Sequence, residues 1–328
     1  MELPLPLHTA IENELTSHPT TRLAALAAQL SKNYRAGVPF NGGTYLRSLE
    51  DVTAYAAFRL PATFAAVYSA LKQAKECSPG WNPKTLLDAG AGPGTAMWAA
   101  ASLWPDLEHI TLLERDEAMI NLGKRLCAYS SVPSMLEAEW IKIDIAETDE
   151  VFPHDLVVAS YVLNEIPESR SQAFIRKLWE STGDTLVVIE PGTPEGFWRI
   201  KQAREQLAAA GAKMIAPCPH DKSCPMPESD WCHFAQRVAR SRLHRKVKGG
   251  ELSYEDEKFS FVCMSRTGGR TAQGRVIRHP QVRKGHIRLE LCTSEGLTSI
   301  VVTRKDKELF RRTRELQWGS AFSPTPKT

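Results

Sequence analysis

Residues 9–78 show a helical pattern of apolar positions. Apolar side chains recur at intervals of three and four residues, first at Leu23 and Leu26 and again at Phe64 and Val67. Because this is the period of one face of a helix, the pattern predicts a helical N-terminal region, which we place at residues 1–80.

From Lys84 the pattern changes to short apolar strands separated by helical stretches. Strand, helix and strand in this order predict a mostly parallel sheet covered by helices on both faces, and we place this α/β domain at residues 81–213. The expected strands are 85–88, 109–114, 140–144, 155–160 and 185–190, and the expected helices are 96–103, 116–129, 168–180 and 195–210.

The pattern changes again after Gly211. A loop rich in proline and cysteine covers residues 216–232, and a strongly basic run over 233–248 has the apolar spacing of a helix. From Gly274 the alternation is strand-like, and a short helix is expected near 307–316. We therefore expect residues 214–328 to form a second, cysteine-containing and β-rich module.

Charge is divided unevenly between the two parts of the chain. Residues 1–217 carry 19 Lys and Arg against 26 Asp and Glu, a balance of −7, whereas residues 218–328 carry 22 against 12, a balance of +10. A basic C-terminal part favours a polyanionic partner, with an ordinary solvated surface as the alternative.

The sequence contains no apolar run near the roughly 18 residues that a membrane-spanning helix needs. The stretch from Met1 to His8 also lacks the pattern of a secretory signal. We therefore expect a cytoplasmic protein with no membrane partner and no DNA partner. In that compartment the seven cysteines are reduced, and they serve in packing or as metal ligands.

A glycine loop follows the first expected strand of the α/β domain. The strand ends at Asp88, and Gly90, Gly92 and Gly94 follow at every second position. In a dinucleotide-binding loop the last glycine comes three positions after the second, so the spacing here differs. Glycines permit positive φ and let a ligand approach the backbone. The loop predicts a ligand site at the carboxyl ends of the strands.

Carboxylates also end the next two expected strands. Glu114 lies 20 residues beyond Gly94 and can accept hydrogen bonds from the two hydroxyls of a ribose, and Asp144 can accept one from an adenine amino group. The alternative is that the glycines make a tight turn and the acids cap helices.

The stretch from about residue 80 to 200 resembles the nucleotide-binding half of the class I S-adenosylmethionine-dependent methyltransferases. The resemblance implies a Rossmann-like, mostly parallel sheet that binds S-adenosylmethionine. It also implies that the methionine part of the cofactor lies against the first acid and the glycines, and the ribose against the second-strand acid. The cofactor-binding residues expected here are Asp88, Gly90, Gly92, Gly94, Glu114 and Asp144.

The segment after the fourth expected strand does not identify a reaction. It lacks the Asn/Asp-Pro-Pro-aromatic motif of many base amino methyltransferases, and none of the cysteines falls where a C5-pyrimidine methyltransferase needs its nucleophile. Tyr161, Asn164 and Glu165 are candidates to face a substrate, with a shape-setting turn as the alternative. No catalytic residue is assigned.

Three cysteines, Cys218, Cys224 and Cys232, lie within 15 residues of a proline-rich loop. Their spacing differs from that of zinc ribbons, and Cys-Pro pairs occur beside iron–sulfur clusters. As a fourth thiol we favour Cys292, at a strand end, over Cys263, which lies on an apolar run. Zinc held by three cysteines with His220 or His233 is the alternative. Cys77 and Cys127 fall in helical patterns and are expected to pack.

The run Cys-Pro-His-x-x-x-Cys-Pro, followed by Asp-Trp-Cys-His-Phe-x-Gln-Arg and by the late segment ending at Cys292, resembles the methyltransferase-like assembly factors of the mitochondrial small ribosomal subunit and their bacterial relatives. The likeness covers most of residues 45–320. It implies binding to small-subunit ribosomal RNA or to the pre-ribosomal small subunit. It also implies a [4Fe–4S] cluster on four cysteines, which map onto Cys218, Cys224, Cys232 and Cys292.

The basic run supplies cations suited to phosphate, because arginine makes bidentate contacts that carry affinity without sequence information. Further cations are expected on the surface of the β-rich tail, at Arg275, Arg278, Arg283, Lys284 and Arg288. Three functions stay open: an active RNA methyltransferase, a non-catalytic assembly factor that uses the fold as a scaffold, and a small-molecule methyltransferase with a zinc site. The RNA-binding residues expected are Arg237, Arg240, Arg245, Lys246 and Lys248.

Overall fold

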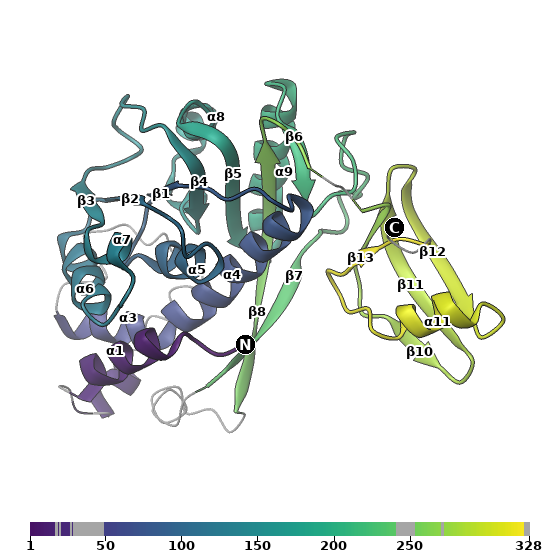
Figure 1. Ribbon diagram of the computed structural model, residues 1–328, viewed down its shortest axis with the longest axis horizontal. Helices are drawn as coiled ribbons and strands as arrows, with labels where there is room; N and C mark the ends of the chain where they lie inside the picture. The colour runs from purple at the N-terminus through teal and green to yellow at the C-terminus, as the bar shows by residue number, and fades with distance from the viewer. Residues whose placement is uncertain are drawn as a thin grey trace.

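A computed structural model of the chain describes residues 1–16, 19, 21–26, 28, 49–240, 253–269 and 272–324. A large α/β unit and a smaller sheet lie side by side (Figure 1). The helices are α1 (Leu5–Thr16), α3 (Leu49–Phe58), α4 (Leu60–Cys77), α5 (Thr95–Leu103), α6 (Glu117–Cys127), α7 (Pro133–Leu136), the 3₁₀ helix η1 (Leu163–Glu165), α8 (Glu168–Glu180), α9 (Pro194–Ala209) and α11 (Lys307–Thr313). The strands are β1 (Thr85–Ala89), β2 (His109–Glu114), β3 (Glu139–Lys142), β4 (His154–Ser160), β5 (Thr182–Pro191), β6 (Lys213–Ala216), β7 (Phe234–Ala239), β8 (Tyr254–Ser265), β9 (Gly274–Val276), β10 (Gln281–Arg283), β11 (His286–Thr293), β12 (Gly296–Thr303) and β13 (Ala321–Phe322).

The large sheet has the strand order β3-β2-β1-β4-β5-β8-β6, with β7 also paired to β8. The first five strands are mutually parallel, whereas β8 runs antiparallel to both of its neighbours β5 and β6. One reversed strand beside an otherwise parallel sheet is the arrangement of the class I methyltransferase fold. The predicted fold class is confirmed.

Successive residues of the central strands pack in two different hydrophobic cores, one on each face of the sheet. On β1, Leu86 packs in the core beneath α4 and α5, while its neighbour Leu87 packs in the core beneath α8 and α9. Successive side chains of a strand point to opposite faces, so a strand buried on both faces reads as a continuous apolar run. This explains why the strands are recognisable from the sequence. The predicted helical N-terminal region supplies α1, α3 and α4.

The sheet continues past residue 213, since β6, β7 and β8 all belong to it. β6 pairs with Cys263–Ser265 at one end of β8, and β7 pairs with Tyr254–Phe259 at the other end. The cysteine-rich loop, residues 217–233, connects β6 to β7. Both ends of this loop are therefore attached to the same strand.

The prediction of a helix over 233–248 is wrong for its described part, because residues 234–239 form the strand β7. Phe234 and Val238 are buried, as expected, but a spacing of four residues fits a strand as well as a helix. The segment forms a strand because it pairs with β8, a separate segment of the chain. Residues 241–252, which hold Arg245, Lys246 and Lys248, lie outside the described residues.

The small sheet is built around β11, which pairs with β10, β9 and β12. Its inner face carries Ile287, Leu289 and Leu291, which pack in one cluster with Leu309 and Phe310 of α11. The opposite face of β10, β11 and β12 is exposed to solvent. Among the described residues, no helix is long and apolar enough to cross a membrane.

Candidate functional site

A pocket opens where β1, β2 and β4 end. Since these strands are parallel, their carboxyl ends meet at one edge of the sheet, where α/β folds bind ligands. Of the six predicted cofactor residues, Gly90, Gly92, Glu114 and Asp144 line the pocket, whereas Asp88 and Gly94 do not. Gly94 instead adopts a left-handed conformation as the residue that caps the start of α5.

The first two glycines of the loop have different neighbours, although both have positive φ, +74° at Gly90 and +54° at Gly92. A Cβ on Gly90 would lie 2.6 Å from Cγ2 of Val162, whereas a Cβ on Gly92 would meet no atom within 4 Å. Gly90 is therefore needed for packing against the end of β4. Gly92 keeps the backbone open toward the pocket.

Glu114, the last residue of β2, is hydrogen-bonded to the glycine loop. Its carboxylate accepts hydrogen bonds from the backbone N–H of Gly92 at 2.7 Å and of Asp116 at 2.8 Å. Burial raises the pKa of Glu114, and the N–H groups of Asp116 and Gly92 oppose that rise by stabilising the charged form. The carboxylate thus lies in the pocket with its orientation set by the loop.

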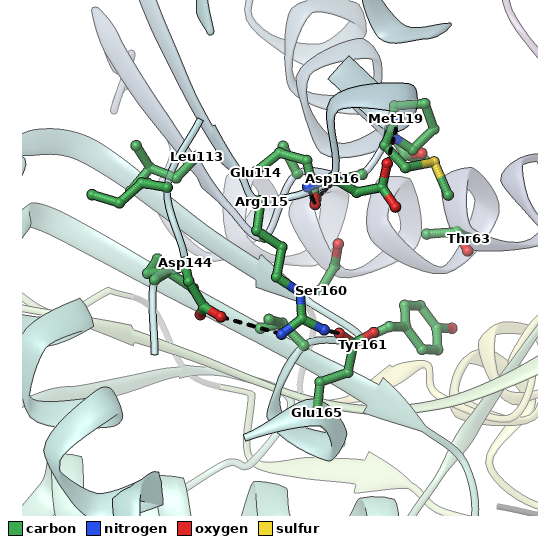
Figure 2. A pocket seen from close by; sticks show the side chains of 18 of the residues that line it. Thr63, Leu113, Glu114, Arg115, Asp116, Met119, Asp144, Ser160, Tyr161 and Glu165 are labelled. Carbon is green, nitrogen blue, oxygen red and sulfur yellow. Dashed lines mark hydrogen bonds and ion pairs between the residues drawn. The ribbon is translucent and has the colours of Figure 1, made fainter. Parts of the chain in front are cut away.

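Arg115 spans the pocket between two acids (Figure 2). Its guanidinium lies 3.3 Å from the Asp144 carboxylate and 2.9 Å from that of Glu165. Burial raises the pKa of Glu165 to about 7, although Arg115 lowers it. A carboxyl group that is half protonated near neutral pH can donate or accept a proton in a reaction.

Asp88 lies fully buried behind the pocket. Among the described residues, neither carboxylate oxygen has a hydrogen-bond partner within bonding distance. Burial raises the pKa of Asp88 to about 8, and the nearby backbone N–H groups of Met97 and Ala96 lower it in part. The group is therefore largely protonated at neutral pH in the protein without cofactor.

The three candidate substrate-facing residues after β4 separate into two groups. Tyr161 and Glu165 line the pocket, whereas Asn164 does not. Tyr161 has a φ of +59°, which is uncommon for a residue with a side chain, and its hydroxyl donates to Glu257 at 2.9 Å. Arg59 donates to both oxygens of Glu257, so a partly buried ion pair holds Tyr161 in place.

A second cavity is lined by all four predicted metal-binding cysteines: Cys218, Cys224, Cys232 and Cys292. Cys218 and Cys232 flank the strand ends of β6 and β7, and Cys292 comes from β11 of the small sheet. The pKa of the Cys232 thiol lies well above its usual value, first because of burial and then because of repulsion by thiolates at the other three positions. The four thiols therefore share one cavity.

The other cysteines lie elsewhere. Cys263 is fully buried on β8 with its thiol 3.8 Å from the carbonyl oxygen of Ala70, and Cys127 is buried in α6. Of the two histidines of the zinc alternative, His220 lies 3.8 Å from the Cys292 sulfur, and His233 stacks on Trp231 and meets Trp318 edge-on. Within the described part of the chain, no three His, Cys, Asp or Glu side chains lie in an arrangement that could hold a metal ion.

Two buried arginines, Arg204 and Arg275, line the same cavity. Arg204 donates to the carbonyl oxygens of His220 and Lys222 in the cysteine loop. Arg275 donates to the carbonyl oxygens of Pro217 and Gly319 and to the side chain of Gln73. Neither forms an ion pair with a carboxylate among the described residues. The cavity thus holds two positive charges beside four thiols.

The two described members of the predicted RNA-binding set are already paired. Arg237 lies 2.8 Å from Asp256 and over the ring of Tyr254, and Arg240 lies 3.0 Å from Glu255. These acids come from β8, whose pairing with β7 brings them opposite the arginines. Arg245, Lys246 and Lys248 lie outside the described residues.

The chain matches the model of a protein family over most of its length. The family is described as mitochondrial small ribosomal subunit Rsm22, and the match covers residues 49–323. The chain belongs to the Rsm22 family. The predicted kinship with small-subunit assembly factors is confirmed.

Relatives of this Rsm22-family chain have names that refer to ribosome assembly. The human ribosome assembly protein METTL17, mitochondrial, is 28% identical over 301 residues, which cover 83% of this chain and 64% of the human protein. The Saccharomyces cerevisiae ribosome assembly protein RSM22, mitochondrial, is 20% identical over 86% of this chain and 68% of the yeast protein. The chain thus spans just under two thirds of the human relative.

Among solved structures, the Rsm22-family chain is similar to methyltransferases. Magnesium protoporphyrin IX methyltransferase from Synechocystis with bound SAM shares 11% identity at a TM-score of 0.39, over 67% of this chain and 84% of that one. The N-methyltransferase NodS from Bradyrhizobium japonicum shares 13% identity at a TM-score of 0.39, over 62% of this chain and 96% of that one. At these TM-scores the likeness carries no argument about function.

Sequence reasoning missed three arginines at the two cavities of this Rsm22-family protein. Arg115 directly follows Glu114, but only the pocket shows that it joins Asp144 to Glu165. Arg204 lies on a helix that reads as ordinary amphipathic sequence. The sequence presents Arg275 as a surface cation, whereas it is 4% exposed. A signal for Arg275 was available, because it stands between glycine and an apolar run in a strand.

Proposed function

We propose that this protein binds S-adenosylmethionine and acts in assembly of the small ribosomal subunit. The observation that carries the first part is the pocket that Gly92 leaves open and Glu114 lines at the strand ends. A carboxylate at the end of the second strand is suited to the ribose hydroxyls. The family supports the second part.

Cofactor binding is tested by titration calorimetry with S-adenosylmethionine. Glu114→Gln keeps an acceptor but loses the charge, and Glu114→Ala loses both. We expect affinity to fall about tenfold or more for Glu114→Ala, since ribose hydrogen bonds to a charged group contribute roughly 1.5–3 kcal/mol. Equal affinity in wild type and Glu114→Ala would remove the ribose role. Wild-type protein that binds no cofactor would contradict the proposal.

The proposed role in small-subunit assembly is tested by deleting the gene and by mapping modified nucleotides in the small-subunit ribosomal RNA. A single methylated nucleotide that disappears with the gene assigns an active RNA methyltransferase. An unchanged modification pattern with defective small subunits assigns a scaffold. Glu165 is the pocket residue best placed to move a proton, so Glu165→Gln should abolish that methylation only in the first case. A small-molecule methyltransferase would leave the small subunits normal.

We further propose that Cys218, Cys224, Cys232 and Cys292 hold a [4Fe–4S] cluster. The donor set has the chemistry that such a group needs, because the four thiols line one cavity while Cys263 lies outside it, and cluster binding would bring the thiols closer together than they lie in the described structure. Four thiolates around a cluster of charge +2 leave a net charge of −2, and the buried Arg204 and Arg275 supply the opposite charge. When bound, the cluster would join the loop to the small sheet and thereby stabilise the module.

The cluster is tested by anaerobic purification followed by analysis of iron, sulfide and zinc. About four irons and four sulfides are expected, lost in Cys292→Ser and kept in the control Cys263→Ser. One zinc per chain would instead assign the alternative, with His220 next to Cys292 as the candidate fourth ligand. A protein that keeps its iron in Cys292→Ser would contradict the ligand set.

A further inference from the structure

The exposed face of β10, β11 and β12 carries a concave basic surface. Gln281, Arg283, Lys284, Gly285, His286, Arg288, Val301 and Thr303 line it, and none of them is acidic. We define these eight residues as the sheet-face surface. It lies on the side of the small sheet opposite α11, so the packing of the small core leaves it free to meet a partner.

The register of the strands places its polar side chains next to one another. Arg283 pairs with His286 and Gln281 with Arg288 across β10 and β11. His286 then pairs with Thr303, and Arg288 with Val301, across β11 and β12. Residues paired across neighbouring strands project from the same side of a sheet. Three strands thus present cations, an amide and a hydroxyl in a continuous array.

The cations of this surface are available to a partner. Arg283 and Lys284 make no side-chain hydrogen bond or ion pair within the described part of the chain, whereas Arg288 pairs with Glu290 at 3.0 Å and also donates to the Ser299 hydroxyl. Arg237 of β7 and Arg240, which follows that strand, are paired with Asp256 and Glu255. Residues 274–324 carry 11 Lys and Arg against 5 Asp and Glu, a balance of +6.

We infer that the sheet-face surface binds the phosphate backbone of RNA, an inference that rests on the proposed role in small-subunit assembly. Two unpaired cations, Arg283 and Lys284, lie beside the paired Arg288 in one concave array, which suits a chain of phosphates better than a single small anion. Its lining contains no phenylalanine, tyrosine or tryptophan on which bases could stack. The surface therefore contributes affinity and orientation without reading sequence.

The test measures binding of a labelled small-subunit ribosomal RNA transcript from about 50 to about 200 mM salt. We expect Arg283→Gln/Arg288→Gln to weaken binding at least tenfold at the lowest salt. The slope of log affinity against log salt should fall by about two, because each arginine removed leaves about one phosphate without a neutralising cation. The charge-conserving pair Arg283→Lys/Arg288→Lys should keep most of the affinity.

The matched control is Arg170→Gln/Arg176→Gln on α8, which removes the same charge from two exposed arginines of the large unit. Its affinity and slope should equal those of the wild type. Unchanged binding in Arg283→Gln/Arg288→Gln overturns the inference and leaves the proposed function intact. Wild-type protein that binds no RNA overturns both. If poly-glutamate binds in a salt-dependent manner while the transcript does not, the surface takes an acidic protein instead of RNA.

Discussion

The guanidinium of Arg275 on β9 donates from Nε to the carbonyl oxygen of Pro217 at 2.7 Å. Pro217 immediately precedes Cys218, so this bond joins the small sheet to the first cysteine of the loop. The same side chain also reaches Gln73 on α4 and Gly319 near the C-terminal end. One buried arginine thus connects four segments that lie far apart in the sequence.

Replacement of Arg275 by leucine should lower the free energy of unfolding by about 3 kcal/mol, because carbonyl groups bound to a charged donor are left buried without a partner. Urea denaturation followed by fluorescence measures the change. The control is Arg176→Leu, since Arg176 is exposed on α8 and its only described partner is Glu180 one helical turn away. Equal midpoints for the two variants would show that Arg275 does not stabilise the packing.

Substitutions at Gly90 and Gly92 of the cofactor loop should affect two different properties, the stability of the protein and its affinity for the cofactor. Gly90→Ala places a Cβ against Val162 and should cost about 1–3 kcal/mol of stability through overpacking, in addition to about 1 kcal/mol from its positive φ. Val162→Ala in the same chain should restore part of that loss. Gly92→Ala should cost about 1 kcal/mol, from its positive φ alone, while S-adenosylmethionine affinity falls more than tenfold. Urea midpoints and calorimetric titration measure the two effects, and a Gly92→Ala protein with normal affinity would contradict this division.

Stability should fall as pH rises toward 8 because of Asp88. Its pKa is about 8 in the folded protein and about 4 when unfolded, so between these values only the folded state keeps the proton. Each pH unit in that window should remove about 1.4 kcal/mol from the free energy of unfolding, and the loss should stop above about pH 8.

Asp88→Asn should remove the contribution of Asp88 to the fall of the free energy of unfolding with pH. Urea denaturation at a series of pH values measures this change. Glu190 provides an independent comparison, since burial also raises its pKa to about 8 and it lies at the end of β5. Glu190→Gln should remove a similar share, and the double variant should remove both. An unchanged pH dependence in Asp88→Asn would show that the buried carboxyl is ionised.

Loss of the proposed cluster should open the C-terminal module and leave the cofactor pocket intact. In Cys224→Ser we expect faster proteolysis within residues 217–233 and unchanged affinity for S-adenosylmethionine. The reason is that the pocket lies at the ends of β1, β2 and β4, whereas the loop begins at β6, which is separated from β4 by two strands of the sheet. Cys127→Ser is the control, since Cys127 packs in α6 away from the cavity. A Cys224→Ser protein with an intact module that still binds RNA would rule out a structural role for the cluster.

The parts of the fold that the sequence predicted well depend on local patterns. Strands buried on both faces are short apolar runs, and the acids that end β1 and β2 belong to the same stretches as the strands. The glycine loop between β1 and α5 is also local. These features place Gly90, Gly92 and Glu114 in the pocket with no knowledge of distant contacts.

The parts that were missed depend on distant segments. β7 has helical spacing in isolation, and only Tyr254–Phe259 of β8 makes it a strand. The same pairing brings Asp256 to Arg237 and so removes a cation that the sequence presents as free. Arg275 is a cation beside an apolar run, and its burial depends on contacts with Pro217 and Gly319, which lie far from it in the sequence. The strand β7, the pairing of Arg237 and the burial of Arg275 all depend on contacts between separate segments, which no local pattern specifies here.

The order of the strands also determines when the cysteine loop can form during synthesis. β6 and β7, which begin and end the loop, pair only with β8 within the described sheet, and β8 is complete at Ser265. Chains fold from the N-terminus as they emerge from the ribosome. The five parallel strands can therefore assemble first, while the loop remains without a strand to pair with. Cys292 emerges later still, so the proposed cluster can gain its fourth thiolate only after most of the chain has been synthesised.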